Sequence, residues 1–481
     1  MGTVVPEKRS YKPFIHVVIM MSLMLFVRYI PPVGSITPLG MATLGIFVGI
    51  IYGWSTLGMI FPSFIGIMAF GFLEGNTVRA AVSTALGDRI TIIIFLLFLV
   101  SALVEKAGLS DWIARWCITR KFAAGRPWVI AIMFCVAGSI ISATVNLFAA
   151  IILMWNVFYS FCEQVGYKKG DRYPSLVLMA ILYCCTMFGG VLPYMSISIL
   201  VVGQLEKFTG LGINYFQFTV TMLVLSLIAA GIYFLILKYV FKPDVSCILN
   251  SNSDFFKQEL PKLTGHQKLV CVLLITLMVF LFLPSLLPAT IPGISFLKAL
   301  DMSGVALVIL SAYYILMLGR KDVIRFGELA KGISWDMIFM FATVAPLSVA
   351  INNPDSGILI FVKESMSSLL NGLSPILFTM ALFIIGSIIT QFANNAVIVM
   401  IMSPIMFSLG DVVGANPYAL TVLAAYCMNI AFVLPASSGP ASMGFSNDWI
   451  GKKTSYTHGA IIFVLTLLVT FIGIPITNLV F

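Results

Sequence analysis

The sequence predicts an all-α, polytopic membrane protein with two inverted repeats, re-entrant hairpins and broken helices. Hydrophobic residues fill 60% of the 481 positions and charged residues only 10%, which excludes an ordinary soluble protein. A bilayer core of about 30 Å takes about 20 apolar residues per helix, and on that ruler the chain offers roughly ten to twelve crossings or half-crossings. The repeat shows in the run GSIIS at 138–142, which returns as GSIIT at 386–390.

Charge and cysteine usage narrow the class further. The net charge of +9 comes from basic residues dispersed between apolar runs, which is typical of cytoplasmic loops and excludes a nucleic-acid partner. The eight cysteines and three histidines show no metal-ligand spacing, so no metal centre or organic cofactor is expected. The first apolar run, residues 13–31, is too long for a signal peptide and follows Lys8 and Arg9. We therefore expect a multi-pass protein of the cell inner membrane with a cytoplasmic N-terminus.

The first third of the chain supplies spans and a surface helix. Residues 13–72 read as three spans. The apolar run 90–103 is short for a crossing, which favours a re-entrant hairpin built from it and the residues before it. Residues 110–121 interleave an apolar face with basic residues, a pattern that indicates an interfacial helix.

The next stretch carries the polar interruption. Residues 128–161 exceed one crossing and contain Ser142, Thr144 and Asn146, which predicts two half-helices that meet at an unwound centre. The span at 175–204 holds glycines and Pro193 at mid-membrane, where exposed backbone must face protein or a cavity.

The second half repeats this order. A short run at 337–350, an amphipathic segment at 358–369, a long interrupted run at 373–409 and a span that ends in Pro, Gly and Ser follow one another. We predict five domains: N-terminal scaffold helices, a first repeat core, a polar linker, second-half scaffold helices and a second repeat core, at residues 1–86, 87–241, 242–267, 268–332 and 333–481.

Neutral polar residues at matched positions predict the site. Asn146, Asn394 and Asn395 place amides at membrane depth, where an unsatisfied polar group costs several kcal/mol. Hydrogen bonds between helices are the simpler explanation for one such residue, but matched copies beside broken helices favour a transport site. Amides at half-helix N-termini suit an anion, and unwound carbonyls suit a cation such as sodium.

These residues resemble the divalent anion/sodium symporters, the di- and tricarboxylate and sulfate transporters of the ion transporter superfamily. That family carries a Ser-Asn-Thr motif at the tip of a hairpin in each half. Here Asn146 and Asn394 occupy the tips, Pro404 follows ten residues after Asn394, and TQF at 390–392 is similar to the lead-in Thr-Glu-Phe. The resemblance runs from about residue 87 to the end of the sequence.

The resemblance implies residue roles. The substrate-binding residues would be Asn146, Asn394, Asn395, Pro193 and Pro440. The sodium ligands would be Ser142, Asn146, Gly190, Thr390, Asn394 and Asn395. The sequence departs from the motif where Leu147, Phe148 and Ala396 replace its Asn and Thr positions, and these changes bear on sodium coupling and carboxylate recognition.

The sequence thus predicts a secondary carrier for a small anion, foremost a dicarboxylate, with sodium as the candidate coupling ion. The resemblance adds an elevator-type motion and a homodimer. Two alternatives stay open: a superfamily relative that carries another anion or couples to protons, and a passive anion channel. An enzyme is disfavoured because Ser142 has no nearby His or Lys.

Overall fold

The computed structural model describes residues 11–118, 125–249, 262–288, 290–370, 372–392, 394–435 and 437–481. These residues are almost entirely helical and include no strand. The predicted all-α class is therefore confirmed. Residues 119–121 of the expected interfacial helix and residues 250–261 of the expected linker lie outside the described part of the chain.

The helices form two compact units, Met1–Ile92 with Ser334–Leu369, and Ile93–Ile333 with Leu370–Phe481. The first unit contains α1 (Lys12–Phe26), α2 (Pro38–Thr56), α3 (Ile60–Phe70), α4 (Val78–Leu86), α16 (Trp335–Asn352) and nearly all of α17 (Ile358–Leu370). Within it, Phe64 of α3 meets Phe339 of α16 edge to face, with ring centroids 4.6 Å apart, and Trp54 Nε1 donates to Ser63 Oγ at 3.0 Å.

The second unit contains the larger set of helices and all of the predicted site residues. Its helices are α5 (Arg89–Lys106), which begins in the first unit, α6 (Leu109–Ile118), α7 (Pro127–Thr144), α8 (Leu147–Gln164), α9 (Arg172–Gly189), α10 (Ser196–Thr209), α11 (Tyr215–Leu235), α12 (Ser246–Leu249), α13 (Gly265–Leu286), α14 (Ile294–Leu316), α15 (Phe326–Ala330), α18 (Pro375–Thr390), α19 (Asn395–Val413), α20 (Pro417–Cys427), α21 (Gly439–Ser446) and α22 (Lys452–Val480).

Among the described residues, ten helices are long and apolar enough to cross a membrane, or eleven if the bent pair α4 and α5 counts as one span. The number agrees with the predicted ten to twelve crossings or half-crossings. The protein is therefore a multi-pass membrane protein, as predicted.

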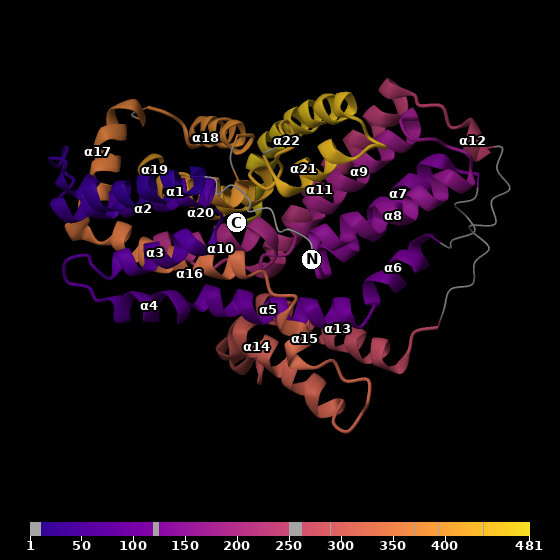
Figure 1. Cartoon of the computed structure of the whole chain (residues 1–481), viewed down its shortest axis with the longest axis horizontal. Coiled ribbons are helices and arrows are strands. Elements are labelled where there is room, and N and C mark those ends of the chain that lie inside the picture. The colour runs from indigo at the N-terminus through magenta and orange to yellow at the C-terminus, as the bar shows by residue number, and fades with distance from the viewer. Residues whose placement is uncertain are drawn as a thin grey trace, which may run out of the picture. The chain divides into compact units, whose positions relative to one another are not determined.

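The apolar run at 128–161 folds back on itself at its polar interruption. Helices α7 and α8 lie side by side (Figure 1), and Phe134 of α7 packs edge to face on Phe158 of α8 with ring centroids 5.0 Å apart. Asn146 stands at the turn between the two helices. The expected half-helices with an unwound centre are therefore the two arms of a hairpin.

A second hairpin forms from α18 and α19, which pack on each other. A Cβ atom on Gly386 would lie 2.8 Å from Met428 Cε and 3.8 Å from Met402 Cε. Gly138 has the corresponding surroundings in the first hairpin, since its Cβ would lie 2.6 Å from Cys185 Sγ and 3.2 Å from Met154 Cγ. The shared glycine thus packs the first arm of each hairpin against its own second arm and the helix that follows.

Each hairpin precedes an interrupted helix. An irregular turn separates α9 from α10, and another separates α20 from α21. Proline and glycine at these breaks prevent a continuous helix. The expected hairpin of residues 90–103 and the residues before them corresponds to α4 and α5, two helices bent by 46° at a short break, as in a broken span or a re-entrant loop.

Candidate functional site

The first tip uses its polar side chains to close the hairpin. Asn146 Oδ1 accepts hydrogen bonds from the backbone N–H groups of Phe148 and Ala149 at 2.8 and 3.1 Å, so Asn146 is the N-cap of α8. Ser142 is buried, and its hydroxyl donates to the Cys185 carbonyl of α9 at 2.6 Å. Both predicted residues are present at the tip: the Asn146 oxygen accepts two hydrogen bonds, and the Ser142 hydroxyl donates its proton.

The second tip contains two adjacent asparagines in different roles. Asn394 is exposed and caps α19, with Oδ1 accepting from the Ala396 N–H at 2.9 Å. Asn395 is only 7% exposed and donates from Nδ2 to the Asn429 carbonyl at 3.1 Å. Its Oδ1 has no hydrogen-bond partner among the described residues.

The end of α18 supports the second tip. Thr390 is fully buried, and its hydroxyl donates to the Ser387 carbonyl of the same helix at 2.9 Å. Gln391 reaches the segment after α20, because its Oε1 accepts from the Val433 N–H at 3.0 Å. The tip is therefore anchored to the break between α20 and α21.

The break after α9 lies against the first tip. A Cβ on Gly189 would lie 2.6 Å from Ser142 Oγ and 3.9 Å from Leu147 Cδ1. At the next residue, the carbonyl of Gly190 accepts a hydrogen bond from Ser198 Oγ of α10 at 2.5 Å. Pro193 is buried in the same turn, as the sequence predicts for backbone that must not face lipid.

Pro440 lies at the start of α21, beside the first hairpin. It follows the N-cap Ser438, whose hydroxyl accepts from the Ala441 N–H at 3.1 Å. At Gly439, a Cβ would lie only 2.7 Å from the ring of Phe148. Phe148, which replaces the threonine of the family motif, thus fills the space between the first tip and α21.

Sequence reasoning missed Asn429, which joins these parts. Asn429 is 5% exposed, and its Nδ2 donates to the Thr186 carbonyl at 2.9 Å. Ser196 Oγ donates to its Oδ1 at 3.2 Å. The sequence does hold a signal for it: the pair Tyr-Cys occurs at 183–184 and at 426–427, and this register aligns Asn429 with the polar Thr186.

No formal charge lies near either tip along the chain, because residues 127–162 and 375–410 contain no Asp, Glu, Lys or Arg. Helix ends then contribute to the local field. The N-termini of α8 and α19 lie at the tips, and such ends carry about half a positive charge each. The described residues hold no cluster of His, Cys, Asp or Glu suited to a metal ion.

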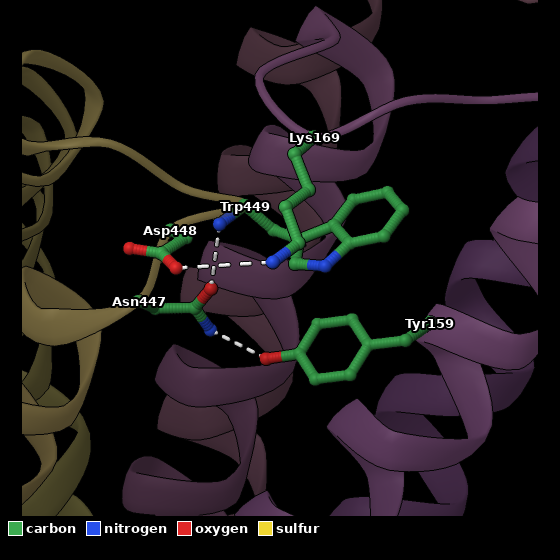
Figure 2. Close-up of polar contacts among 5 residues, drawn as sticks. All are labelled: Tyr159, Lys169, Asn447, Asp448 and Trp449. Atoms are coloured by element: carbon green, nitrogen blue, oxygen red, sulfur yellow. Dashed lines mark hydrogen bonds and ion pairs between the residues drawn. The ribbon is translucent and has the colours of Figure 1, made fainter.

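A separate cavity of about 550 Å³ opens at the other end of α8. Figure 2 shows its polar contacts: Asn447 Nδ2 donates to the Tyr159 hydroxyl at 2.7 Å, and Lys169 pairs with Asp448 at 3.8 Å. The rings of Tyr159 and Trp449 stack with centroids 5.5 Å apart. These contacts tie α8 to the segment before α22.

Comparison with known proteins gives one family and several relatives. The family model described as citrate transporter matches residues 17–425. A sodium-dependent dicarboxylate transporter SdcS of Staphylococcus saprophyticus is 23% identical over 402 residues, which are 81% of this chain and 76% of that protein. The SdcS protein of Staphylococcus aureus is 25% identical over 421 residues, 82% of this chain and 78% of that protein.

Two solved structures share the fold. The MtrF protein of Neisseria gonorrhoeae, described within a class of antimetabolite efflux pumps, aligns with a TM-score of 0.59 at 14% identity and covers 99% of this chain and 96% of its own. The YdaH transporter of Alcanivorax borkumensis aligns with a TM-score of 0.53 at 13% identity, covering 84% and 89%. At these identities the likeness concerns the fold alone.

Proposed function

This chain belongs to the citrate transporter family and is a secondary transporter, and from that premise we propose that it carries a small dicarboxylate together with sodium. The expected family of di- and tricarboxylate transporters is confirmed. The relatives named as sodium-dependent dicarboxylate transporters support the choice of substrate and coupling ion.

The uncharged tips support an anionic substrate. The N-termini of α8 and α19 lie at the tips, and no Asp or Glu lies near either tip along the chain. The positive ends of the two helix dipoles favour a carboxylate there. Bound sodium then adds the positive charge that a dianion needs at membrane depth.

Asn395 Oδ1, which has no hydrogen-bond partner in the described part of the chain, is the observation that carries sodium coupling. An amide oxygen is a hard ligand of the kind that alkali and alkaline-earth cations prefer. A buried acceptor without a partner costs free energy of about 1–3 kcal/mol, and a bound cation removes that cost. At the first tip Asn146 Oδ1 already accepts two backbone hydrogen bonds. We therefore assign the main sodium site to the second tip.

Uptake into proteoliposomes tests the proposal. We expect labelled succinate to accumulate, and an inward sodium gradient to increase the initial rate. Asn395→Ala removes the free oxygen and should raise the sodium half-saturation concentration about tenfold, which corresponds to about 1.4 kcal/mol. Asn395→Asp keeps an oxygen ligand and should retain more of the sodium dependence.

Asn156→Ala is the matched control, because Asn156 is exposed on α8 and lines the other cavity. Equal sodium dependence in Asn395→Ala and the wild type would remove the second-tip assignment. Sodium-independent uptake that follows a proton gradient would replace sodium by protons as the coupling ion.

An elevator-type motion and a homodimer are the remaining parts of the proposal, and both rest on the resemblance. All eight predicted site residues belong to one compact unit, as they must if they move as one body. Cross-linking in native membranes that yields a dimer at low protein density would support the assembly, and a strictly monomeric protein would exclude it.

A further inference from the structure

The amide nitrogen and the amide oxygen of the Asn429 side chain each form a hydrogen bond with another element. Nδ2 donates to Thr186 in the last turn of α9, and Oδ1 accepts from Ser196 at the start of α10. The backbone carbonyl of Asn429 accepts from Asn395 at the start of α19. One residue thereby connects the second tip with both sides of the break in the first half.

This connection fixes the amide of Asn395. Because Nδ2 faces the Asn429 carbonyl, rotating the amide by 180° would set two oxygens against each other. Asn395 Oδ1 must therefore point away from Asn429, toward the position where it has no partner. A shift of the Asn429 backbone would move this ligand oxygen directly.

The same residue touches the turn that supports the first tip. A Cβ on Gly190 would lie 3.0 Å from Asn429 Nδ2, while a Cβ on Gly189 would lie 2.6 Å from Ser142 Oγ. The two glycines place bare backbone between Asn429 and the first hairpin. There is no room for a side chain at either glycine, so the backbone of the turn is closely packed on both sides and can pass a displacement from one to the other.

Backbone strain marks the same spot. Ser196 has a φ of 52°, a left-handed conformation that is unfavourable for a residue with a side chain. Strained conformations persist where the surrounding structure holds them, and they gather at functional sites. The hydrogen bond to Asn429 is one of the contacts that hold Ser196 in place.

We infer that Asn429 is a positioning residue that couples the two tips, so that a ligand bound at one tip changes the affinity of the other. This rests on the proposed function for its ligands, but the coupling itself is a property of the protein alone. Because coupling between sites is reciprocal, sodium and substrate should strengthen each other's binding by the same factor.

Hydrogen exchange of the purified, ligand-free protein tests the link without transport. We expect Asn429→Ala to speed exchange in peptides from both tips, residues 142–149 and 391–399. Thr421→Val is the matched control, because Thr421 is equally buried on α20 but bonds only within its own helix. Faster exchange at the second tip with an unchanged first tip would overturn the inference.

Transport kinetics add a second measurement, the effect of succinate on the sodium half-saturation concentration, which a residue with a purely structural role would leave unchanged. In the wild type, saturating succinate should lower the sodium half-saturation concentration by at least about fivefold, and in Asn429→Ala this ratio should fall to about one. A variant that loses maximal rate but keeps the ratio contradicts the coupling role. If the wild type takes up no succinate, the proposed function fails while the exchange experiment still decides the inference.

Ser196→Ala provides a second variant should Asn429→Ala not fold. It removes one bond of Asn429 and leaves those to Thr186 and Asn395 in place. We expect a smaller change of the same kind at both tips, and Ser196→Gly should match it while relieving the strain. An unchanged first tip in both Ser196 variants would also count against the coupling.

Discussion

Asparagine does two different jobs at the tips, and its position relative to the helix start decides which. Asn146 and Asn394 precede their helices, and their side-chain oxygens accept hydrogen bonds from backbone N–H groups. Asn395 comes one residue later, inside the first turn, so its side chain is released from capping. A proposed ligand oxygen and a cap thus stand side by side in the sequence.

The close approach of Gly189 to Ser142 makes a prediction at this scale. Gly189→Ala would place its Cβ 2.6 Å from Ser142 Oγ, and we expect a loss of about 1–3 kcal/mol in stability from the overpacking. Adding Ser142→Ala removes that oxygen and leaves the Cβ of residue 142 at 3.8 Å and Leu147 Cδ1 at 3.9 Å, both ordinary contacts. Melting temperatures of both single variants and the double variant measure the effect.

The double variant should therefore be more stable than Gly189→Ala alone. Additive losses would show that the clash is absorbed elsewhere, for example by a shift of the break itself. Gly231→Ala serves as a control, because no atom lies within 4 Å of the Cβ that it would gain.

The absence of titratable side chains among the eight predicted residues gives a pH prediction. Asn, Ser, Thr, Gly and Pro do not change charge between pH 6 and 8. The initial rate of succinate uptake should then be constant over this range once it is plotted against the concentration of the dianion. A remaining bell-shaped profile would reveal a titrating residue outside this set.

At the scale of elements, each hairpin depends on the cap at its turn. Asn146→Ala leaves two N–H groups of α8 without their acceptor and should cost about 1 kcal/mol. Asn146→Ser keeps a capping oxygen and should retain most of the stability. Thermal unfolding of both variants in detergent measures the difference, and equal melting temperatures would contradict a capping role.

The contact at the far end of α8 predicts an effect on stability alone. Tyr159→Phe keeps the stack on Trp449 but loses the bond from Asn447, at a cost of about 1 kcal/mol. Tyr159 lies about 20 Å along α8 from Asn146, given a rise of about 1.5 Å per residue. Half-saturation concentrations for sodium and succinate should therefore not change, and a shift in either would show that this cavity communicates with the tips.

The repeated glycine run predicted where the paired elements lie, but apolar periodicity did not predict how they fold. A straight broken helix and a hairpin need the same apolar residues on either side of a polar centre. The contacts of Gly138 with Cys185 and Met154 decide between them, and such contacts depend on residues far along the chain. For the same reason the short run at 90–103 and the residues before it predict a re-entrant element, while its bend of 46° between α4 and α5 is known only from the structure.

For the whole molecule, the carrier mechanism predicts exchange across the membrane. Proteoliposomes loaded with unlabelled succinate should accumulate labelled succinate transiently from outside, because a carrier returns with a bound substrate. A passive channel lets the label equilibrate without this overshoot. The measurement is the time course of label when unlabelled succinate inside is in large excess over labelled succinate outside, and a simple rise to equilibrium would contradict the carrier.

The joining of the two halves was beyond the reach of the sequence. Family and class followed from composition, the repeat and the tip asparagines, because these are local patterns. Asn429 meets Thr186 and Ser196 only after the two halves have packed together. In the sequence, a single asparagine inside an apolar run indicates a hydrogen bond between neighbouring helices more often than a functional residue. Its importance shows only when its partners are known.

The capped tips also constrain how the protein is made. A hairpin turn at membrane depth cannot be left facing lipid, and Ser142 finds its partner only on α9. The first hairpin is therefore complete only after the ribosome has delivered α9, and the second, through Asn395, only after α20 and the residue that follows it. We therefore expect biogenesis to proceed in two stages, each finished by the helix after the hairpin, so that a nascent chain that stalls between them would expose a polar turn to quality control.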